Sequence, residues 1–444
     1  MKLTGILGLA VVGFLLATGT IWASGEQDAG AASDEPKSLL YWHKDAPAFH
    51  DWVTNLAEQY MIANPNTTIN IERQTGSWGD YGTKIRLVLR SGKDVPDIIQ
   101  IHDIDNSTLA SAGFFNEAPE PIAKIMDENS LHPTFRKMAH QDGDLDKPVM
   151  IINLFTHWQQ LYYNSDYLQE AGLPMRGAET WDELREYARK LVKTDASGNI
   201  TRAGFTFRIQ DPAWAFGAWM HSAGGTWLND DNSAADVMTP DGRQAWGNAL
   251  QFIYDVTWTD KAGDFRMGEP REAFHQGLNA ISAEGIYDIA RISNNAPNLN
   301  WIIDNIPTGE YSSTILAVRP VSVYKDSENP DEAWRFLGYI IQDENISELF
   351  DIGSFSLLPP YMSASMLPKF QSEEPWKIAT QQKNLRSRMQ GTGATDYYTQ
   401  VGREIEAFLS KTKSLDDALD GMVAAYEEIT ETRYISEIKV PFDD

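Results

Sequence analysis

The chain has 444 residues, no cysteine and 42% hydrophobic residues. It can therefore bury a large core, while disulfides, thiolate metal sites, iron–sulfur clusters and a cysteine nucleophile are excluded. Asp and Glu number 63 against 37 Lys and Arg, and the net charge of −26 opposes polyanions, so we expect no nucleic-acid partner. The length exceeds what one hydrophobic core usually supports, which predicts at least two lobes.

A secretory signal peptide is predicted for residues 1–23. Lys2 supplies a positive start, residues 3–17 form an uncharged apolar run, and small residues lead to the expected cut after Ala23. Residues 24–37 are small and polar and are expected to form a flexible leader. An uncleaved membrane anchor is the alternative, because the run could just span a bilayer. A bacterial lipoprotein needs a cysteine after its signal, so we expect a soluble protein, free in the periplasm.

Strand and helix patterns alternate along the first part of the chain. Short apolar or alternating runs predict strands at residues 39–42, 69–71 and 96–101. Helical repeats lie between them, at residues 49–60 and 81–88. This β-α-β-α-β order predicts parallel strands with right-handed crossovers, whose ligands gather beyond the carboxyl ends of the strands.

A second α/β unit is predicted to begin at the strand 161–164. Thr180 and Glu183 have the spacing of a capping box at a helix start. Residues 315–324 resemble a return strand, and Pro330 opens a further helix. The last third is expected to be mostly helical, with another cap at residues 414–417.

No catalytic or metal-binding motif was found. The sequence has no nucleophile elbow, no H-E-x-x-H helix, no P-loop and no dinucleotide fingerprint, and its eight histidines are scattered. We therefore expect no enzymatic activity, no metal and no cofactor. An exported glycoside hydrolase is a lesser alternative, because such an enzyme needs only a pair of carboxylates.

Aromatic residues beside polar ones provide the better indication of a site. A sugar stacks its C–H faces on aromatic rings and pairs its hydroxyls with polar side chains. Such residues follow the three N-terminal strands, at one end of the predicted sheet: Trp42, His43, Trp78, Tyr81 and Asp103. The candidates in the rest of the chain are Trp158, Gln159, Trp214, Trp219, Trp227, Glu284, Tyr287 and Phe355.

Two further positions carry expectations of their own. Gly285 is expected to let the backbone approach a ligand. Trp52 and Trp181 lie on helical stripes and are expected in the core.

A series of phrases, in order along the chain, resembles the extracellular solute-binding proteins of ABC transporters, in particular the sugar-binding group that is similar to maltose-binding protein. The phrases are Val95-Pro96-Asp97-Ile98-Ile99, Leu161-Tyr162-Tyr163-Asn164, Ala171-Gly172-Leu173-Pro174, Thr180-Trp181-Asp182-Glu183-Leu184, Phe274-His275-Gln276-Gly277 and Ala333-Trp334-Arg335-Phe336-Leu337. Each phrase alone is weak, but together and in this order they are specific.

The resemblance implies an α/β, two-lobed periplasmic-binding-protein fold of type II. Each lobe would be a mostly parallel sheet flanked by helices, and three crossovers would join the lobes. Mapped onto this chain, lobe 1 comprises residues 38–157 and 318–354, and lobe 2 comprises residues 158–317 and 358–444. The hinges are expected near residues 158–161, 316–318 and 354–360.

The resemblance also implies a function. The protein would be a monomeric binding component of an ABC importer that takes a mono- or oligosaccharide into the interlobe cleft and delivers it to a membrane permease. A cationic or other polar solute, such as a polyamine or a glycerol phosphodiester, is the alternative. The acidic balance of the chain favours the cationic one. Residues 316–320 lack the family's common double glycine, and Ile281-Ser282 replaces its usual methionine-led pair, so the identity of the ligand should not be copied from a relative.

Overall fold

In the computed structural model, residues 35–209 and 211–442 are described. The predicted signal peptide and nearly all of the predicted leader lie outside these ranges. Within them, no helix combines the length and the apolar character needed to cross a membrane.

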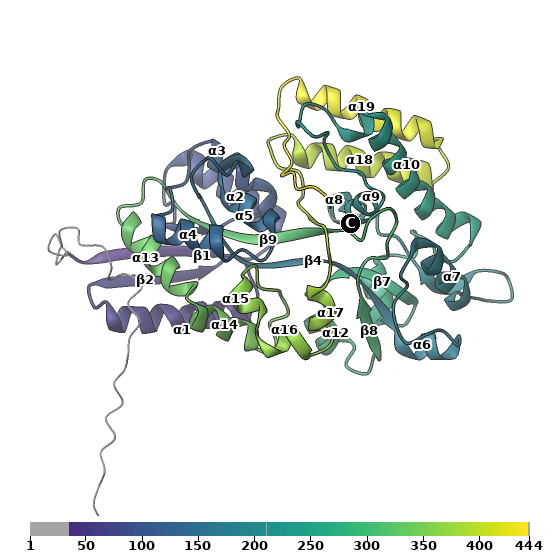
Figure 1. The fold of residues 1–444 in the computed structure, drawn as a ribbon, viewed down its shortest axis with the longest axis horizontal. Coiled ribbons are helices and arrows are strands. Elements are labelled where there is room, and N and C mark those ends of the chain that lie inside the picture. Colours follow the sequence, from purple (N-terminus) through teal and green to yellow (C-terminus); the bar gives the residue numbers. More distant parts are fainter. Residues whose placement is uncertain (1–34, 210, 443–444) are drawn as a thin grey trace, which may run out of the picture. The chain divides into compact units, whose positions relative to one another are not determined.

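Strands and helices alternate through much of the described chain, and the part from residue 330 on is mostly helical (Figure 1). The strands are β1 (Lys37–His43), β2 (Thr67–Arg73), β3 (Ile98–Gln100), β4 (Ile152–Asn164), β5 (Lys193–Thr194), β6 (Ile200–Phe205), β7 (Asn279–Gly285), β8 (Trp301–Asp304), β9 (Thr314–Val323) and β10 (Leu385–Arg386). The helices are α1 (Pro47–Ala63), α2 (Trp78–Ser91), α3 (Asn106–Ser111), α4 (Glu120–Glu128), α5 (Pro133–Ala139), α6 (Ser165–Glu170), α7 (Trp181–Leu191), α8 (Pro212–Ala215), α9 (Gly217–Ser222), α10 (Pro240–Tyr254), α11 (Pro270–His275), α12 (Asp288–Asn295), α13 (Pro330–Ile340), α14 (Asp343–Asp351), α15 (Met362–Ser365), α16 (Pro368–Ser372), α17 (Trp376–Thr380), α18 (Ala394–Leu409) and α19 (Leu415–Thr430).

The N-terminal β-α-β-α-β unit is confirmed. Strand β1 pairs in parallel with both β2 and β3, so the carboxyl ends of the three strands lie at one edge of the sheet. Helix α1 buries the predicted apolar stripe, including Phe49 and Trp52. Helix α2 begins in a capping box, in which Ser77 and Asp80 each accept a hydrogen bond from the other's backbone N–H.

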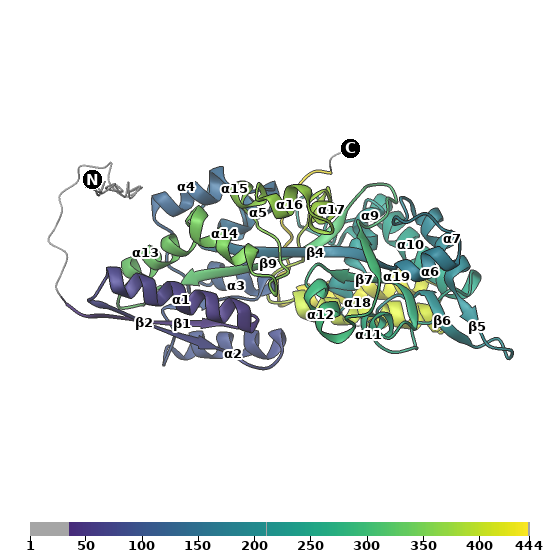
Figure 2. The same ribbon diagram turned by 90° about the horizontal axis from the view of Figure 1, so that it is seen from below.

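Two long strands, β4 and β9, run through the middle of the sheet. The strand order is β2-β1-β3-β9-β4-β7-β6-β5, with β8 on β4 and β10 on β9. Residues 152–158 of β4 pair antiparallel with β9, and residues 159–164 pair antiparallel with β7 and β8. Figures 1 and 2 show β4 and β9 extending from the half of the sheet that carries β1 and β2 toward the half that carries β7.

The sheet is mixed rather than uniformly parallel. Strands β6 and β7 are parallel, as β1, β2 and β3 are, whereas β9 is antiparallel to β3 and β4 is antiparallel to β7. Both β4 and β9 are buried along their whole length. Strand β4 also begins earlier than the predicted strand 161–164, because residues 152–158 complete the pairing with β9.

Two hydrophobic cores flank the long strands. The first core contains Phe49, Trp52 and Ile98, and residues 358–385 add their buried apolar side chains to it. The second core contains Trp219 and Trp246 together with the buried faces of α18 and α19. The division of the chain between lobes at the predicted residue boundaries stays a prediction.

The predicted helix caps are present, with one difference. Ser414 and Asp417 form a complete capping box at the start of α19. At α7 the Thr180 side chain accepts from the Glu183 N–H, but the Glu183 carboxylate accepts from the Glu179 N–H and pairs with Arg176 at 2.7 Å. The capping box predicted at Thr180 is therefore only half formed, because the arginine competes for the glutamate.

Candidate functional site

A cavity of about 920 Å³ lies beyond the carboxyl ends of β1, β2 and β3. Lys44 and Asp45 follow β1, Trp78 follows β2 and His102 follows β3, and all four line it. The opposite side is formed by residues of the second half of the sheet and by the loop 354–357. Its volume lies at the upper end of the usual range for ligand sites, about 300–1,000 Å³.

Trp78 is the aromatic residue at the β2 end of the cavity. Its ring stacks on His102, with 5.6 Å between the ring centroids. The Arg319 guanidinium lies 4.3 Å from the Trp78 centroid, within the range of a cation–π contact. Trp78 is therefore held between charged and aromatic neighbours, and it places Arg319 at the cavity wall.

A second aromatic group stands on the opposite wall. The His157 ring lies between Trp214 and Tyr287, at centroid distances of 5.2 and 5.1 Å. Burial, followed by the field of nearby arginines, lowers the pKa of His157 well below its usual value, so the ring is neutral at neutral pH. The indole Nε1 of Trp214 and Nδ1 of His157 are buried and have no hydrogen-bond partner among the described residues.

Arg388 is fixed in the wall by a buried ion pair with Asp103. Its Nε donates to Asp103 Oδ2 at 3.1 Å and its Nη2 to Oδ1, so the contact is bidentate. The Asp103 side chain is 2% exposed. Burial alone would raise the pKa of Asp103, but the Arg388 guanidinium holds it below its usual range. The pair joins residues that are far apart in the sequence.

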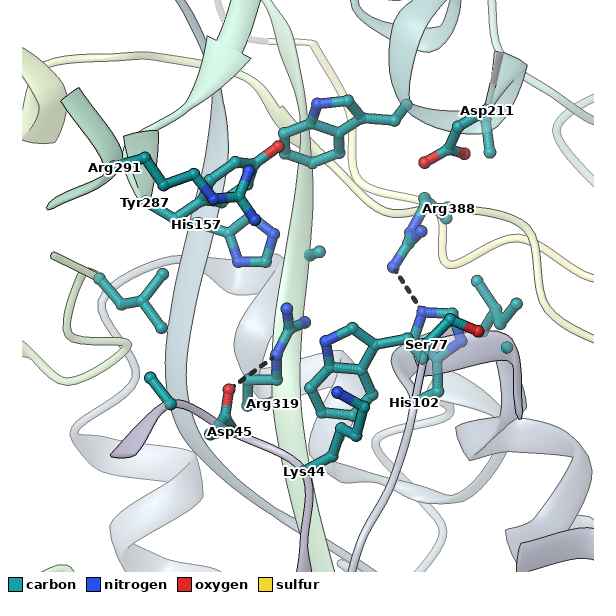
Figure 3. A pocket seen from close by; sticks show the side chains of 18 of the residues that line it. Lys44, Asp45, Ser77, His102, His157, Asp211, Tyr287, Arg291, Arg319 and Arg388 are labelled. Carbon is teal, nitrogen blue, oxygen red and sulfur yellow. Dashed lines mark hydrogen bonds and ion pairs between the residues drawn. The ribbon is translucent and has the colours of Figure 1, made fainter. Parts of the chain in front are cut away.

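Arg319 is a second buried cation, and it is less completely paired. Its Nε lies 3.6 Å from Asp45 Oδ1, beyond hydrogen-bond length, and has no hydrogen-bond partner among the described residues. The other Asp45 oxygen accepts from Gln100 Nε2. Burial lowers the pKa of Arg319 and raises that of Asp45. Figure 3 shows the Arg319 head group pointing into the cavity.

Glu284 lies behind the wall, beside Arg208. Its carboxylate accepts from the Tyr287 hydroxyl at 3.0 Å and lies 3.6 Å from Arg208 Nη1. Burial raises the pKa of Glu284 to about 7. The expected approach of a ligand to the Gly285 backbone stays a prediction. A side chain at this position would collide with the Tyr287 ring, with Cβ 2.4 Å from Cε1. The glycine makes room for a wall residue.

The structure brings four of the predicted site residues to the cavity: Trp78, Trp214, Tyr287 and Phe355. The other nine lie outside its lining. Trp42, His43, Tyr81, Trp158, Trp219 and Trp227 are buried in the fold, and Asp103, Gln159 and Glu284 contact residues of the wall from behind. Trp52 is in the first core as predicted, and Trp181 packs against Phe252 at the edge of the second.

The strand-end residues illustrate the physical reason. Trp42 and His43 are still inside β1 and face opposite sides of the sheet. The His43 ring contacts Phe49 and His50 of α1, and the Trp42 ring centroid lies 4.0 Å from Lys84 Nζ of α2. Tyr81 is one turn into α2, and its hydroxyl donates to the Gln100 carbonyl at 2.8 Å. Both carboxylate oxygens of Asp103 accept hydrogen bonds from Arg388. Of the four predicted residues that reach the cavity, Tyr287 and Phe355 lie in loops, Trp78 is the first residue of α2, and Trp214 lies in the short helix α8.

Sequence reasoning missed the basic residues of the site. Of the described residues that line the cavity, seven are Lys or Arg: Lys44, Arg73, Arg208, Arg271, Arg291, Arg319 and Arg388. Arg319 lies in the segment 316–320, whose departure from the family pattern was a usable signal. The others are scattered along the chain and carry no motif. Among the described residues, no group of three His, Asp or Glu could hold a metal ion.

Comparisons with known proteins agree with this architecture. A family model described as "Bacterial extracellular solute-binding protein" matches residues 46–346, more than half of the chain. An arabinooligosaccharide-binding protein of Halalkalibacterium halodurans is 24% identical over 355 residues, covering 76% of this chain and 74% of that protein.

Solved structures give the same picture. The GacH receptor of Streptomyces glaucescens, described unliganded and with acarbose, is similar with a TM-score of 0.72 and 19% identity, over 89% of this chain and 99% of that one. A cyclic α-maltosyl-1,6-maltose binding protein from Arthrobacter globiformis has a TM-score of 0.73 and 21% identity, over 89% and 99%. These similarities confirm the predicted two-lobed α/β fold.

Proposed function

Because the chain belongs to the bacterial extracellular solute-binding proteins, we propose that it binds a carbohydrate in the cavity beyond β1, β2 and β3 and delivers it to the permease of an ABC importer. The observation that carries the proposal is the cavity wall, which sets aromatic rings beside many hydrogen-bonding groups. Rings contact the C–H faces of a sugar, and polar groups pair with its hydroxyls.

The aromatic contacts are proposed for the predicted residues that line the cavity. Trp214, Tyr287 and Phe355 offer rings on one side and Trp78 on the other. The relatives support a sugar, since one is an arabinooligosaccharide-binding protein and another is described with acarbose.

Binding is proposed to close the protein around the ligand. The lining comes from both halves of the sheet, so a ligand makes all its contacts only when the halves approach each other. Its greater affinity for the closed form then shifts the population toward that form. The hinges predicted at residues 158–161 and 316–318 would fall on β4 and β9, which extend between the halves. The protein is proposed to act as an exported, soluble monomer without enzymatic activity.

The test is calorimetric titration of the purified protein with a panel of mono- and oligosaccharides, together with small-angle scattering. We expect at least one sugar to bind and to reduce the radius of gyration. If every sugar failed and a polyamine bound, the carbohydrate assignment would be wrong. Release of new reducing ends from an oligosaccharide would contradict the absence of enzymatic activity.

A further inference from the structure

The charge of the cavity is opposite to the charge of the protein. The chain carries a net charge of −26, yet seven basic side chains and only two acidic ones, Asp45 and Asp211, are among the described residues that line the cavity. A cavity lined by residues in the proportions of the whole chain would have more acidic than basic side chains. The excess of cations is therefore local to the cavity, and it favours a ligand with negative charge.

Some of these cations are already balanced by the protein. Arg388 is paired with Asp103 at hydrogen-bond distance, and Arg271 Nε lies 3.2 Å from a Glu272 oxygen. Arg208 approaches Glu269 and Glu284 only at 3.5 and 3.6 Å. Its second partner is a weak counter-charge, because burial raises the pKa of Glu284 to about 7.

Other cations have no counter-charge. Among the described residues, no carboxylate oxygen lies within 4.0 Å of Lys44, Arg73 or Arg291, the distance that defines the ion pairs found elsewhere in the chain. Arg291 instead packs on the Tyr287 ring, 4.6 Å from its centroid. Figure 3 shows Arg291 and Arg319 reaching toward the same space from opposite walls.

Two cationic groups of the wall are incompletely paired within the protein. Nε of Arg319 and Nε of Arg208 are buried and have no hydrogen-bond partner among the described residues, and their nearest carboxylate oxygens lie 3.6 and 3.5 Å away. Because these charges are only partly offset by protein carboxylates, an oxyanion in the cavity would stabilise them. Guanidinium groups match the paired oxygens of a carboxylate, sulfate or phosphate, whereas a neutral hydroxyl satisfies one donor at a time.

We propose that the ligand is an anionic carbohydrate, a sugar whose carboxylate, sulfate or phosphate group is bound between Arg291 and Arg319. This inference rests on the proposed function and names the class of its substrate. The sugar ring contacts the aromatic walls, and the oxyanion neutralises the two arginines that project from opposite sides. A cationic solute would meet an excess of like charge in this space, which disfavours its binding there.

The experiment compares ligands that differ only in charge. The protein is titrated with a uronic-acid disaccharide and its neutral methyl ester, with a sulfated sugar and its unsulfated parent, and with a sugar phosphate and its parent sugar. We expect the acidic member of at least one pair to bind about tenfold or more tightly than its neutral partner, because two guanidinium contacts are lost with the charge. The pair that shows the difference identifies the oxyanion. The difference should shrink between about 50 mM and about 500 mM sodium chloride.

Two variants locate the site. Arg291→Gln should weaken binding of the acidic sugar about tenfold or more and leave the neutral partner nearly unaffected. Arg90→Gln removes the same charge from an exposed position on α2 outside the cavity, and it should change neither affinity. Arg319→Met tests the second guanidinium, with circular dichroism to confirm folding. Because Arg291 is exposed, its variant remains informative if the Arg319 variant fails to fold.

The outcomes separate the two proposals. Equal affinity for the acidic and neutral member of every pair would overturn this inference while leaving carbohydrate binding intact. Failure of all sugars, charged and neutral, would overturn both. Tight binding of spermidine would overturn this inference, since it would require a cavity of the opposite sign.

Discussion

The buried ion pair between Asp103 and Arg388 offers a direct test of how the wall of the cavity is held. Asp103→Asn keeps the size of the side chain and removes its charge. The variant also replaces one acceptor with an amide group that donates, and this group would face the guanidinium. Arg388 would then stay in the wall with its charge uncompensated, because its side chain is only 10% exposed.

The expected loss of stability follows from this burial. Removing one partner of a buried ion pair typically costs about 3–5 kcal/mol. Arg388 lines the cavity, where water can reach it, so we expect the lower end of that range, about 3 kcal/mol. The matched control is Asp396→Asn, whose partner Arg433 is 39% exposed, and we expect a change within about 0.5 kcal/mol there.

Equilibrium unfolding in urea, followed by tryptophan fluorescence, measures both variants. The reasoning would be refuted if the free energy of unfolding of Asp103→Asn lay within about 1 kcal/mol of the wild-type value, which is the limit expected for an exposed pair. It would also be refuted if the variant were no less stable than the control. Either result would mean that water in the cavity already solvates the charge of Arg388. A double variant with Arg388→Met should recover part of the loss, because the uncompensated charge is then gone.

Three further predictions concern the site and the fold. Trp78→Ala should weaken ligand binding about tenfold or more without unfolding the protein, while Trp258→Ala, a half-buried tryptophan outside the cavity, should leave the affinity unchanged; calorimetry decides. Glu284→Gln removes a carboxyl whose pKa is about 7 in the folded protein and 4.5 in the unfolded chain, so the folded state binds an extra proton between these values. Between pH 5 and pH 8 the free energy of unfolding of the wild type should therefore fall by about 2 to 3 kcal/mol relative to that of the variant. Parallel pH profiles of the two free energies would contradict this. Ser414→Ala removes the cap of α19 and should cost about 1 kcal/mol, against no measurable change for Ser410→Ala beyond the end of α18, as judged by urea unfolding.

The N-terminal part of the fold was predictable because its patterns are local. The stripe of α1 and the alternation in β2 follow from which side of each element faces the core. The first half of β4 was not predictable in this way. Asn153 and Thr156 interrupt its apolar run, yet both are buried, because their side chains donate to the carbonyls of Phe135 and Ala317. Such partners are distant in the sequence and leave no periodic signal.

The candidate site was predictable to the level of its strand ends and no further. At the end of β1 a single position separates core from cavity, as the buried His43 and the cavity-lining Lys44 show. The arginines were beyond reach for a different reason. Each of them, read alone, is an ordinary surface residue, and only the folded chain gathers Arg73 and Arg388 at one cavity.

The spread of the lining along the chain has a consequence for biogenesis. The wall needs Lys44 near one end of the sequence and Thr399 close to the other. If the chain is exported unfolded with its amino end first, it cannot assemble this cavity until nearly all of it has crossed the membrane. Contacts of such long range also form slowly. An unfolded chain would then carry no cytoplasmic sugar with it, and its first ligand would come from the compartment in which it finishes folding.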